Sequence, residues 1–239
     1  MNKILITRPY GQSLEFQKKL MDYNIQSKVM PLTKIVYQPD WHLGIDVKQY
    51  DLIIFTSSNS IHEFAKHFKD INNKIALVGN QSLHLAKEYG LRNICIVENN
   101  VNDLVAQIKF FFTSGSFLYV SGKFKTVDLG AIFNSKYKIL SVDTYIAEEL
   151  EISEEEFKLD DITSVALFSS RAAQIFLKLV HKYKLYLGNV NLFALSEKIA
   201  KVVCMEPWGG VYIPKLPNGH EMVKTVVNYY ERNNKTQNL

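Results

Sequence analysis

Apolar positions near the start of the chain follow two spacings in turn, and their order predicts parallel α/β structure. Residues 3–9 form an apolar run that ends at Pro9, which is typical of a buried strand. The apolar residues within 14–21 then fall near helical spacing, and a second apolar run follows at 27–31. Because no Asn-Gly or Gly-Gly hairpin signal separates these elements, the pattern favours parallel strands joined by a helix.

The same order of elements occurs twice more, in two stretches that resemble each other. Each begins with an apolar strand that ends in hydroxyls, at 51–59 and at 163–171, and a helical pattern follows each strand. Aligning these two strands on their paired serines brings two further strand–helix units into step. The fold class predicted is α/β, with two similar doubly wound parallel-sheet lobes. The aligned pairs are Ser57-Ser58 with Ser169-Ser170, 74–79 with 190–195, and 93–97 with 210–214.

The two copies differ in length, and the difference predicts how the chain is divided. The first copy adds strands at 116–122 and 137–142, whereas the second lacks them and could use residues 1–31 instead. We therefore expect the chain to start in one lobe, build the whole second lobe and return, with a hinge and a cleft between the lobes. The expected parts are residues 1–34 plus 152–239 for lobe 1, 38–142 for lobe 2, and 35–37 and 143–151 for the interlobe linkers.

Composition and charge narrow the class of protein. A hydrophobic content of 47% and a charged content of 22% are ordinary for a globular protein. The start has no apolar signal-peptide core, and residues 108–120 are too short and too polar to span a bilayer, so we expect a cytoplasmic protein without a membrane partner. The net charge of +4 conceals eight acids and one base within 148–161, which we interpret as a solvated connector. The basic balance of the remainder would attract an anionic ligand.

Polar residues follow six of the predicted strands. Ligands of open parallel sheets bind at the carboxyl ends of the strands, beside helix N-termini. Backbone N–H groups, helix dipoles and hydroxyls at such places suit carboxylates or phosphates. Any single serine or asparagine there could equally be a helix N-cap, but six such loops in register favour an anion site. The loops are 7–8, 56–58, 79–82, 121–123, 169–171 and 196–198.

Motifs for other chemistry are missing. The chain has no Gly-x-Gly-x-x-Gly after a strand, no Walker loop and no zinc spacing of cysteines. His62 and His67 are five residues apart, about 140° on a helix, so we interpret 62–67 as a solvated helix face and not a metal site. Cys95 and Cys204 stand far apart in apolar surroundings and are interpreted as buried reduced thiols.

Taken together, these stretches resemble the uroporphyrinogen-III synthase family over almost the whole chain. The resemblance implies a lyase that cyclises hydroxymethylbilane, a linear tetrapyrrole with eight carboxylates, to uroporphyrinogen III with loss of water and inversion of ring D. It implies no metal or organic cofactor, a monomer, and a transient contact with hydroxymethylbilane synthase. The stretches that carry the resemblance are, in order, 4–9, 51–59, 76–80, 142–145, 166–170 and 194–198.

The resemblance also implies roles for particular residues. Tyr145 matches the family's cleft tyrosine, which is thought to assist departure of the hydroxyl, and its alternative role is packing on the linker. A phenol is a protonated donor at neutral pH, which suits the first role. Where the family has a Gly-x-Thr loop in the second lobe, residues 195–198 leave either Ser196 or Lys198 to replace the hydroxyl. The other expected carboxylate contacts are Ser57, Ser82 and Ser169 by resemblance, and Arg8, Ser121, Gly122 and Lys123 by position alone.

Two other functions are weighed against this one. A non-catalytic bilobal protein that binds a small anion, similar to a cytoplasmic relative of periplasmic binding proteins, would share the hinge and the loops but would need no chemistry at Tyr145. A nucleic-acid partner is not expected, because the sequence shows no recognition motif and no interleaving of basic and aromatic residues.

Overall fold

The structure, a computed structural model, describes residues 3–125, 127–133 and 135–236 and has the α/β order of elements that the sequence predicts. The strands are β1 (Lys3–Ile6), β2 (Gln26–Val29), β3 (Thr33–Tyr37), β4 (Leu52–Phe55), β5 (Lys74–Val78), β6 (Ile94–Glu98), β7 (Gly115–Gly122), β8 (Tyr137–Glu149), β9 (Ile162–Leu167), β10 (Asn191–Ala194) and β11 (Gly210–Tyr212). The helices are α1 (Tyr10–Met21), α2 (Ser58–His67), α3 (Asn80–Glu88), α4 (Val101–Phe111), α5 (Leu129–Ile132), α6 (Ser170–Lys182), α7 (Glu197–Val202) and α8 (Gly219–Thr236), with one 3-10 turn, η1 (Val47–Gln49).

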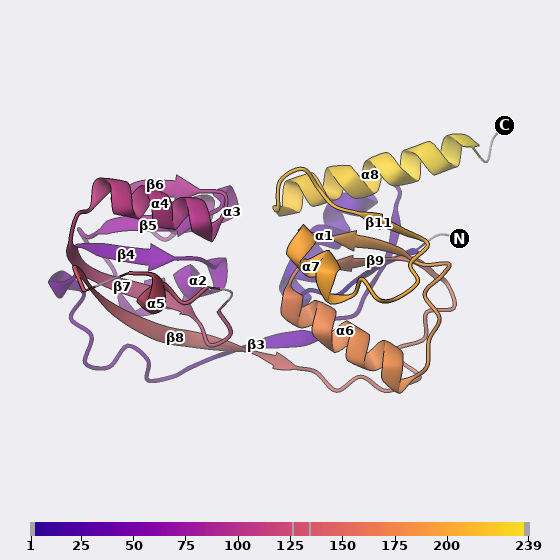
Figure 1. Cartoon of the computed structure of the whole chain (residues 1–239), viewed down its shortest axis with the longest axis horizontal. Helices are drawn as coiled ribbons and strands as arrows, with labels where there is room; N and C mark the ends of the chain where they lie inside the picture. Colours follow the sequence, from indigo (N-terminus) through magenta and orange to yellow (C-terminus); the bar gives the residue numbers. More distant parts are fainter. Residues whose placement is uncertain (1–2, 126, 134, 237–239) are drawn as a thin grey trace. The chain divides into compact units, whose positions relative to one another are not determined.

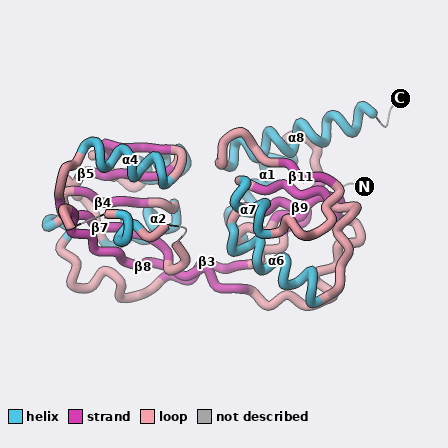
Figure 2. The backbone as a smooth tube through the Cα atoms, in the orientation of Figure 1, coloured by secondary structure: helices cyan, strands magenta, loops and turns pink. Residues whose placement is uncertain are grey.

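The chain divides into two compact units, each built on its own sheet. Unit 1 consists of Met1–Lys34 and Glu148–Leu239, and unit 2 consists of Ile35–Ala147. The strand order is β11-β10-β9-β1-β2 in unit 1 and β3-β8-β7-β4-β5-β6 in unit 2. Figure 2 shows the strands of both sheets in magenta. This arrangement confirms the predicted fold class of two doubly wound, mostly parallel sheets. Among the helices of the described ranges, none is long and apolar enough to cross a membrane.

The N-terminal strand completes the sheet of unit 1, as the missing strands of the second repeat predict. β1 runs parallel to β9, with Ile6 opposite Ala166. Ile4 and Ile6 belong to the core beneath α1 and α8, whereas Leu5 belongs to the core beneath α6 and α7. Because alternate residues of a strand face opposite sides of the sheet, this continuously apolar run supplies both cores. Figure 1 shows α8 and α6 on opposite sides of the strands of unit 1.

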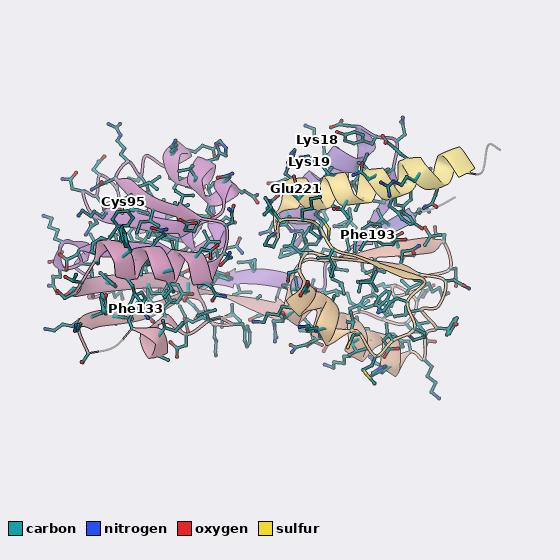
Figure 3. All side chains as sticks on the ribbon, turned by 45° about the horizontal axis from the view of Figure 1, so that its top comes forward. Lys18, Lys19, Cys95, Phe133, Phe193 and Glu221 are labelled. Carbon is teal, nitrogen blue, oxygen red and sulfur yellow. The ribbon has the colours of Figure 1, made fainter. Side chains whose placement is uncertain are left out.

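Unit 2 repeats this construction around β4. Ile53 and Phe55 pack with α2 and α3, whereas Leu52 and Ile54 pack with α4 and α5. Figure 3 marks one core aromatic side chain in each unit, Phe133 in unit 2 and Phe193 in unit 1. The position of β4 between β7 and β5 in unit 2 corresponds to that of β9 between β1 and β10 in unit 1.

The segments expected to be linkers, 35–37 and 143–151, are mostly strand. They belong to β3 and β8, which are neighbours in the sheet of unit 2. The Gln38 N–H donates to the Thr144 carbonyl at 2.9 Å, and the Leu150 N–H donates to the Leu32 carbonyl at 3.0 Å. As the residue number rises from 32 to 38 on one strand, its partner falls from 150 to 144 on the other, so the two strands run in opposite directions. This direction agrees with a chain that passes from unit 1 to unit 2 along β3 and returns along β8.

The acidic run at 148–161 is more than a solvated connector. Glu148 pairs with Lys34 at 3.2 Å and Glu149 with Lys178 at 2.8 Å. All four side chains remain substantially exposed, so these pairs add little stability. Phe157, in the middle of the run, is 1% exposed and lies in the core beneath α6. The run is therefore anchored to unit 1 by an apolar side chain.

Both cysteines are exposed free thiols, so the prediction that they are buried was wrong. Cys95 lies on β6, the edge strand of its sheet, and is labelled in Figure 3. Its neighbour Ile96 is buried in the core while Cys95 is exposed. Cys95 is the extra residue at a register shift between β5 and β6, where Ile75 pairs with Ile94 and Ala76 with Ile96. Such a residue lies outside the regular pairing that places its neighbours in the cores.

The interpretation of 62–67 as a solvated helix face was wrong for Glu63. This side chain is 6% exposed and is held by Lys66 at 2.7 Å and by His67 at 3.2 Å. Burial raises the pKa of Glu63, but the hydrogen bonds and charges of Lys66 and His67 outweigh burial and bring the pKa below its usual value. The ring of His67 also stacks on His42, with 3.7 Å between the ring centroids.

A Glu63→Gln variant is expected to lower the free energy of unfolding by about 1 kcal/mol at pH 7, because a charged hydrogen-bond acceptor is lost. Since the pKa of Glu63 is lower in the folded chain than the unfolded value of about 4.3, its contribution is complete above that pH and is lost as the pH falls through the folded value. The free energies of unfolding in urea of variant and wild type should therefore converge as the pH falls through the folded pKa of Glu63.

The matched control is Glu221→Gln. Glu221 also pairs with a lysine three residues on, Lys224 at 2.8 Å, but its side chain is 20% exposed. We expect a smaller change at pH 7 in this control. A loss for Glu63→Gln that is no larger than the control's, or one that does not depend on pH, would contradict the prediction.

Candidate functional site

The carboxyl edge of the sheet in unit 2 brings Tyr145 and Ser57 together across 88 residues of sequence. Tyr145 lies on β8, and Ser57 comes two residues after β4. Between these strands lies β7, which pairs with both. The Tyr145 hydroxyl donates a hydrogen bond to Ser57 Oγ at 3.0 Å. Two of the residues predicted as candidates are thus in direct contact.

The Oγ atom of Ser57 accepts two hydrogen bonds. This serine is the N-cap of α2, and its Oγ accepts a hydrogen bond from the Asn59 N–H at 3.2 Å. The same atom accepts the hydrogen bond from Tyr145. Both lone pairs of the oxygen are therefore engaged. Its own proton finds no acceptor among the residues that the structure describes, and the side chain is half-buried.

Gly122 provides the space in which the Tyr145 ring lies. The two residues pair across β7 and β8, at an irregularity that shifts the register between Ser121 and Gly122. A Cβ atom added to Gly122 would lie 2.5 Å from Tyr145 Cζ. No real Cβ makes so close a contact, so this residue must be glycine for the ring to keep its place. Position alone had predicted Gly122 as a substrate contact, whereas the structure gives it a role in placing Tyr145.

Tyr37 is a neighbour of Tyr145 that the sequence did not identify. It lies on β3, and the two ring centroids are 6.5 Å apart in an edge-on arrangement. Burial raises the pKa of Tyr37, and the nearby Glu63 raises it further, while Lys66 Nζ lies 4.5 Å from the ring centroid. The sequence did contain a signal for this contact. Segments that cross in opposite directions can pair as antiparallel strands, and such pairing brings side chains of the two strands together.

Ser121 belongs to a second group of hydroxyls, on β7 and directly after β4. Tyr119 Oη and Thr56 Oγ1 share a hydrogen bond of 2.9 Å. Burial raises the pKa of Tyr119, and Thr56 and Ser121 partly oppose this rise. Ser121 is 1% exposed, and its Oγ lies near Tyr119 without meeting hydrogen-bond geometry with any described residue. Lys123 is exposed, and its backbone N–H donates to the Tyr145 carbonyl at 2.9 Å.

Ser82 lies one strand further along the same sheet. It is in the first turn of α3, which follows β5 and begins after Gly79 in a left-handed conformation with φ of 87°. The serine is 5% exposed. No hydrogen bond joins Ser82 to Tyr145 or Ser57 in the described part of the chain, so it is near the pair in the fold but separate from it.

The other candidates lie at the carboxyl edge of the sheet in unit 1. Ser169 is the N-cap of α6 and accepts a hydrogen bond from the Ala172 N–H at 3.1 Å. Ser196 is the N-cap of α7, but its hydroxyl makes no capping hydrogen bond. Lys198 is exposed within the same helix. Both Ser196 and Lys198 therefore stay candidates for the position that the resemblance left ambiguous.

Arg8 follows β1 in the same edge of unit 1. Its Nε and Nη2 atoms donate to Gln12 Oε1 at 3.1 and 2.8 Å, and its Cζ lies 4.7 Å from the centroid of the Phe168 ring. Burial lowers the pKa of Arg8, while the charge of Glu15 raises it. The guanidinium group stays charged at neutral pH. Its contacts with Gln12 and Phe168 involve uncharged groups, so its positive charge remains available for an anion. The candidates thus form two groups, one in each unit.

Known proteins similar to this chain include uroporphyrinogen-III synthases. The family described as uroporphyrinogen-III synthase HemD matches residues 15–224. A curated uroporphyrinogen-III synthase from Chlorobaculum parvum is 34% identical over 67 residues, which are 28% of this chain and only 27% of that protein. The crystal structure of uroporphyrinogen-III synthetase from Helicobacter pylori has a TM-score of 0.65 at 15% identity, covering 96% of this chain and 100% of that one. A mutant uroporphyrinogen III synthase from Thermus thermophilus has a TM-score of 0.61 at 12% identity, covering 97% and 100%.

Proposed function

This chain belongs to the uroporphyrinogen-III synthase family, and we propose that it cyclises hydroxymethylbilane to uroporphyrinogen III in tetrapyrrole and haem biosynthesis. In this reaction the terminal hydroxyl of the linear tetrapyrrole departs and leaves an azafulvene-type cation. Ring D is attacked at its substituted carbon, the spiro intermediate rearranges, and the ring closes as the III isomer with loss of water. The protein acts as a lyase.

The contact between Tyr145 and Ser57 is the observation that carries this proposal. Departure of a hydroxyl needs a proton donor, and Tyr145 offers a protonated phenol in a half-buried position. The phenol is held by a hydrogen bond of 3.0 Å and by the space above Gly122. A protein that only binds anions would need no proton donor at this position.

The charge of the substrate is matched by the remaining candidates. Hydroxymethylbilane carries eight carboxylates, and the chain has a net charge of +4. We propose Arg8, Ser169 and Ser196 or Lys198 as carboxylate ligands in unit 1. Ser82, Ser121 and the first turn of α2 would serve in unit 2, because free N–H groups at a helix N-terminus favour anions. Such contacts would hold a flexible substrate in the arrangement that closes, which is the main source of rate in this scheme.

The test is a direct assay of the product isomer. Purified protein is given hydroxymethylbilane generated enzymatically, and the oxidised products are resolved by chromatography, with a sample lacking the protein as the measure of spontaneous closure. We expect the type III isomer to predominate. Formation of the type I isomer alone would reject the synthase and, if the protein still bound the tetrapyrrole, would favour the non-catalytic anion-binding alternative.

A further inference from the structure

The geometry points to Ser57 as the residue that delivers the proton to the departing hydroxyl. Tyr145 then transfers its own phenolic proton to Ser57 Oγ. This inference rests on the proposed function and changes the role of Ser57 from carboxylate ligand to proton donor. It also makes Tyr145 a group that acts through Ser57.

The direction of the hydrogen bond supports this order. The Tyr145 O–H donates to Ser57 Oγ, so in this arrangement the phenolic proton points at the serine. Ser57 Oγ also accepts from the Asn59 N–H at 3.2 Å, which leaves its own O–H as the free donor of the pair. A substrate hydroxyl that approached the pair would therefore meet the proton of Ser57 first.

The equivalent serine of the other unit shows what a simple N-cap looks like. Ser169 aligns with Ser57 in the internal repeat and caps α6, with its Oγ accepting the Ala172 N–H at 3.1 Å. Within the described residues it receives no hydrogen bond from a tyrosine, and it is exposed where Ser57 is half-buried. Capping a helix thus requires no hydrogen bond from a phenol to the serine, so the phenol at Ser57 needs another explanation.

The surroundings of the two residues also constrain their positions. The Tyr145 ring has room only because Gly122 lacks a Cβ, and the backbone beneath is fixed by the Lys123 N–H that donates to the Tyr145 carbonyl at 2.9 Å. Ser57 is fixed by its place at the start of α2. Proton transfer between two hydroxyls requires hydrogen-bond distance, and the 3.0 Å between Tyr145 Oη and Ser57 Oγ meets this requirement.

The proton transfers balance without any further reagent. As the C–O bond of the hydroxymethyl group breaks, its electron pair stays on the oxygen, which takes the proton of Ser57 Oγ and leaves as water. Ser57 takes the proton of Tyr145 Oη, so a phenolate forms while the substrate becomes a cation. On the final closure, ring D loses the proton of its unsubstituted α-carbon, and this proton returns through Ser57 to the phenolate.

The test compares Ser57→Ala with Asn100→Ala in the isomer assay. Asn100 is the N-cap of α4 in the same unit, accepts the Asp103 N–H at 3.0 Å and lies outside the candidate site, so it controls for the loss of a cap. We expect kcat of Ser57→Ala to fall about 100-fold with KM nearly unchanged, and Asn100→Ala to keep wild-type kcat. Ser57→Thr, which retains a hydroxyl and a capping oxygen, should recover much of the loss. Thermal unfolding checks that each variant is folded.

Two further readouts separate a relay from a structural role. The double variant Ser57→Ala/Tyr145→Phe should be no slower than the slower single variant, because both changes interrupt one chain of transfers. The wild type should show a solvent deuterium isotope effect on kcat that Ser57→Ala loses. A raised KM with unchanged kcat, or losses that multiply in the double variant, would overturn the relay and restore Ser57 as a carboxylate ligand. Because the wild type is assayed first, failure of the synthase reaction itself is distinguished from failure of the relay.

Discussion

Replacing Tyr145 by phenylalanine is expected to lower turnover about 100-fold or more while leaving most of the affinity for the tetrapyrrole product. The variant keeps the aromatic ring over Gly122 and loses only the hydroxyl that bonds to Ser57 Oγ at 3.0 Å. A donor that acts while the hydroxyl departs contributes to the transition state and not to the bound ground state. Its removal therefore lowers kcat more than it weakens binding.

The measurement is kcat from the isomer assay together with the dissociation constant of the product. The matched control is Tyr137→Phe, which removes a hydroxyl from the other end of the same strand, where Tyr137 Oη donates to the Phe112 carbonyl at 2.7 Å. This control should retain wild-type turnover. Equal losses of turnover and product binding in Tyr145→Phe would mean that the tyrosine only packs.

Substituting Gly122 by alanine is the second large effect that we expect, although the change adds a single methyl group. The new Cβ would lie 2.5 Å from Tyr145 Cζ and 2.7 and 2.9 Å from the two Cε atoms. The ring must move away, and the hydrogen bond to Ser57 is lost with it. Turnover should fall about as far as in Tyr145→Phe, and the overpacked contact should lower the free energy of unfolding by about 1–3 kcal/mol.

Gly11→Ala is the control for the glycine substitution. Gly11 is in the first turn of α1, and an added Cβ there meets nothing within 4 Å. This variant should keep its activity and gain slightly in stability, because alanine favours a helix over glycine. Normal turnover in Gly122→Ala would show that the ring does not need its observed place for catalysis.

Much of the fold follows from local patterns in the sequence. The apolar runs within 51–59 and 163–171 predict β4 and β9, and serines at the ends of these stretches, Ser57 and Ser169, cap α2 and α6. The short second copy predicts that the N-terminal strands complete its sheet, and β1 does pair with β9. These predictions succeed because strand and helix periodicity and N-cap chemistry depend on residues close in sequence.

The candidate site is predicted less completely than the fold. The sequence identifies Tyr145 and Ser57 but not their hydrogen bond, and it indicates Tyr37 only as part of a crossing segment. β8 continues to Glu149, beyond the predicted end at residue 142, because it pairs with β3. The burial of Glu63 and the exposure of Cys95 were also missed, since both depend on which face of an element meets a neighbour.

The sequence by itself thus determined the order of strands and helices, the internal repeat and the positions of hydroxyls at strand ends. Only the tertiary structure decided that Tyr145 donates to Ser57, and that Gly122 makes room for the ring. Both contacts join residues on or next to different strands, and they form only in the observed register of those strands. That register includes the shift between Ser121 and Gly122. Register is set by the packing of whole faces against the core and not by neighbours along the chain.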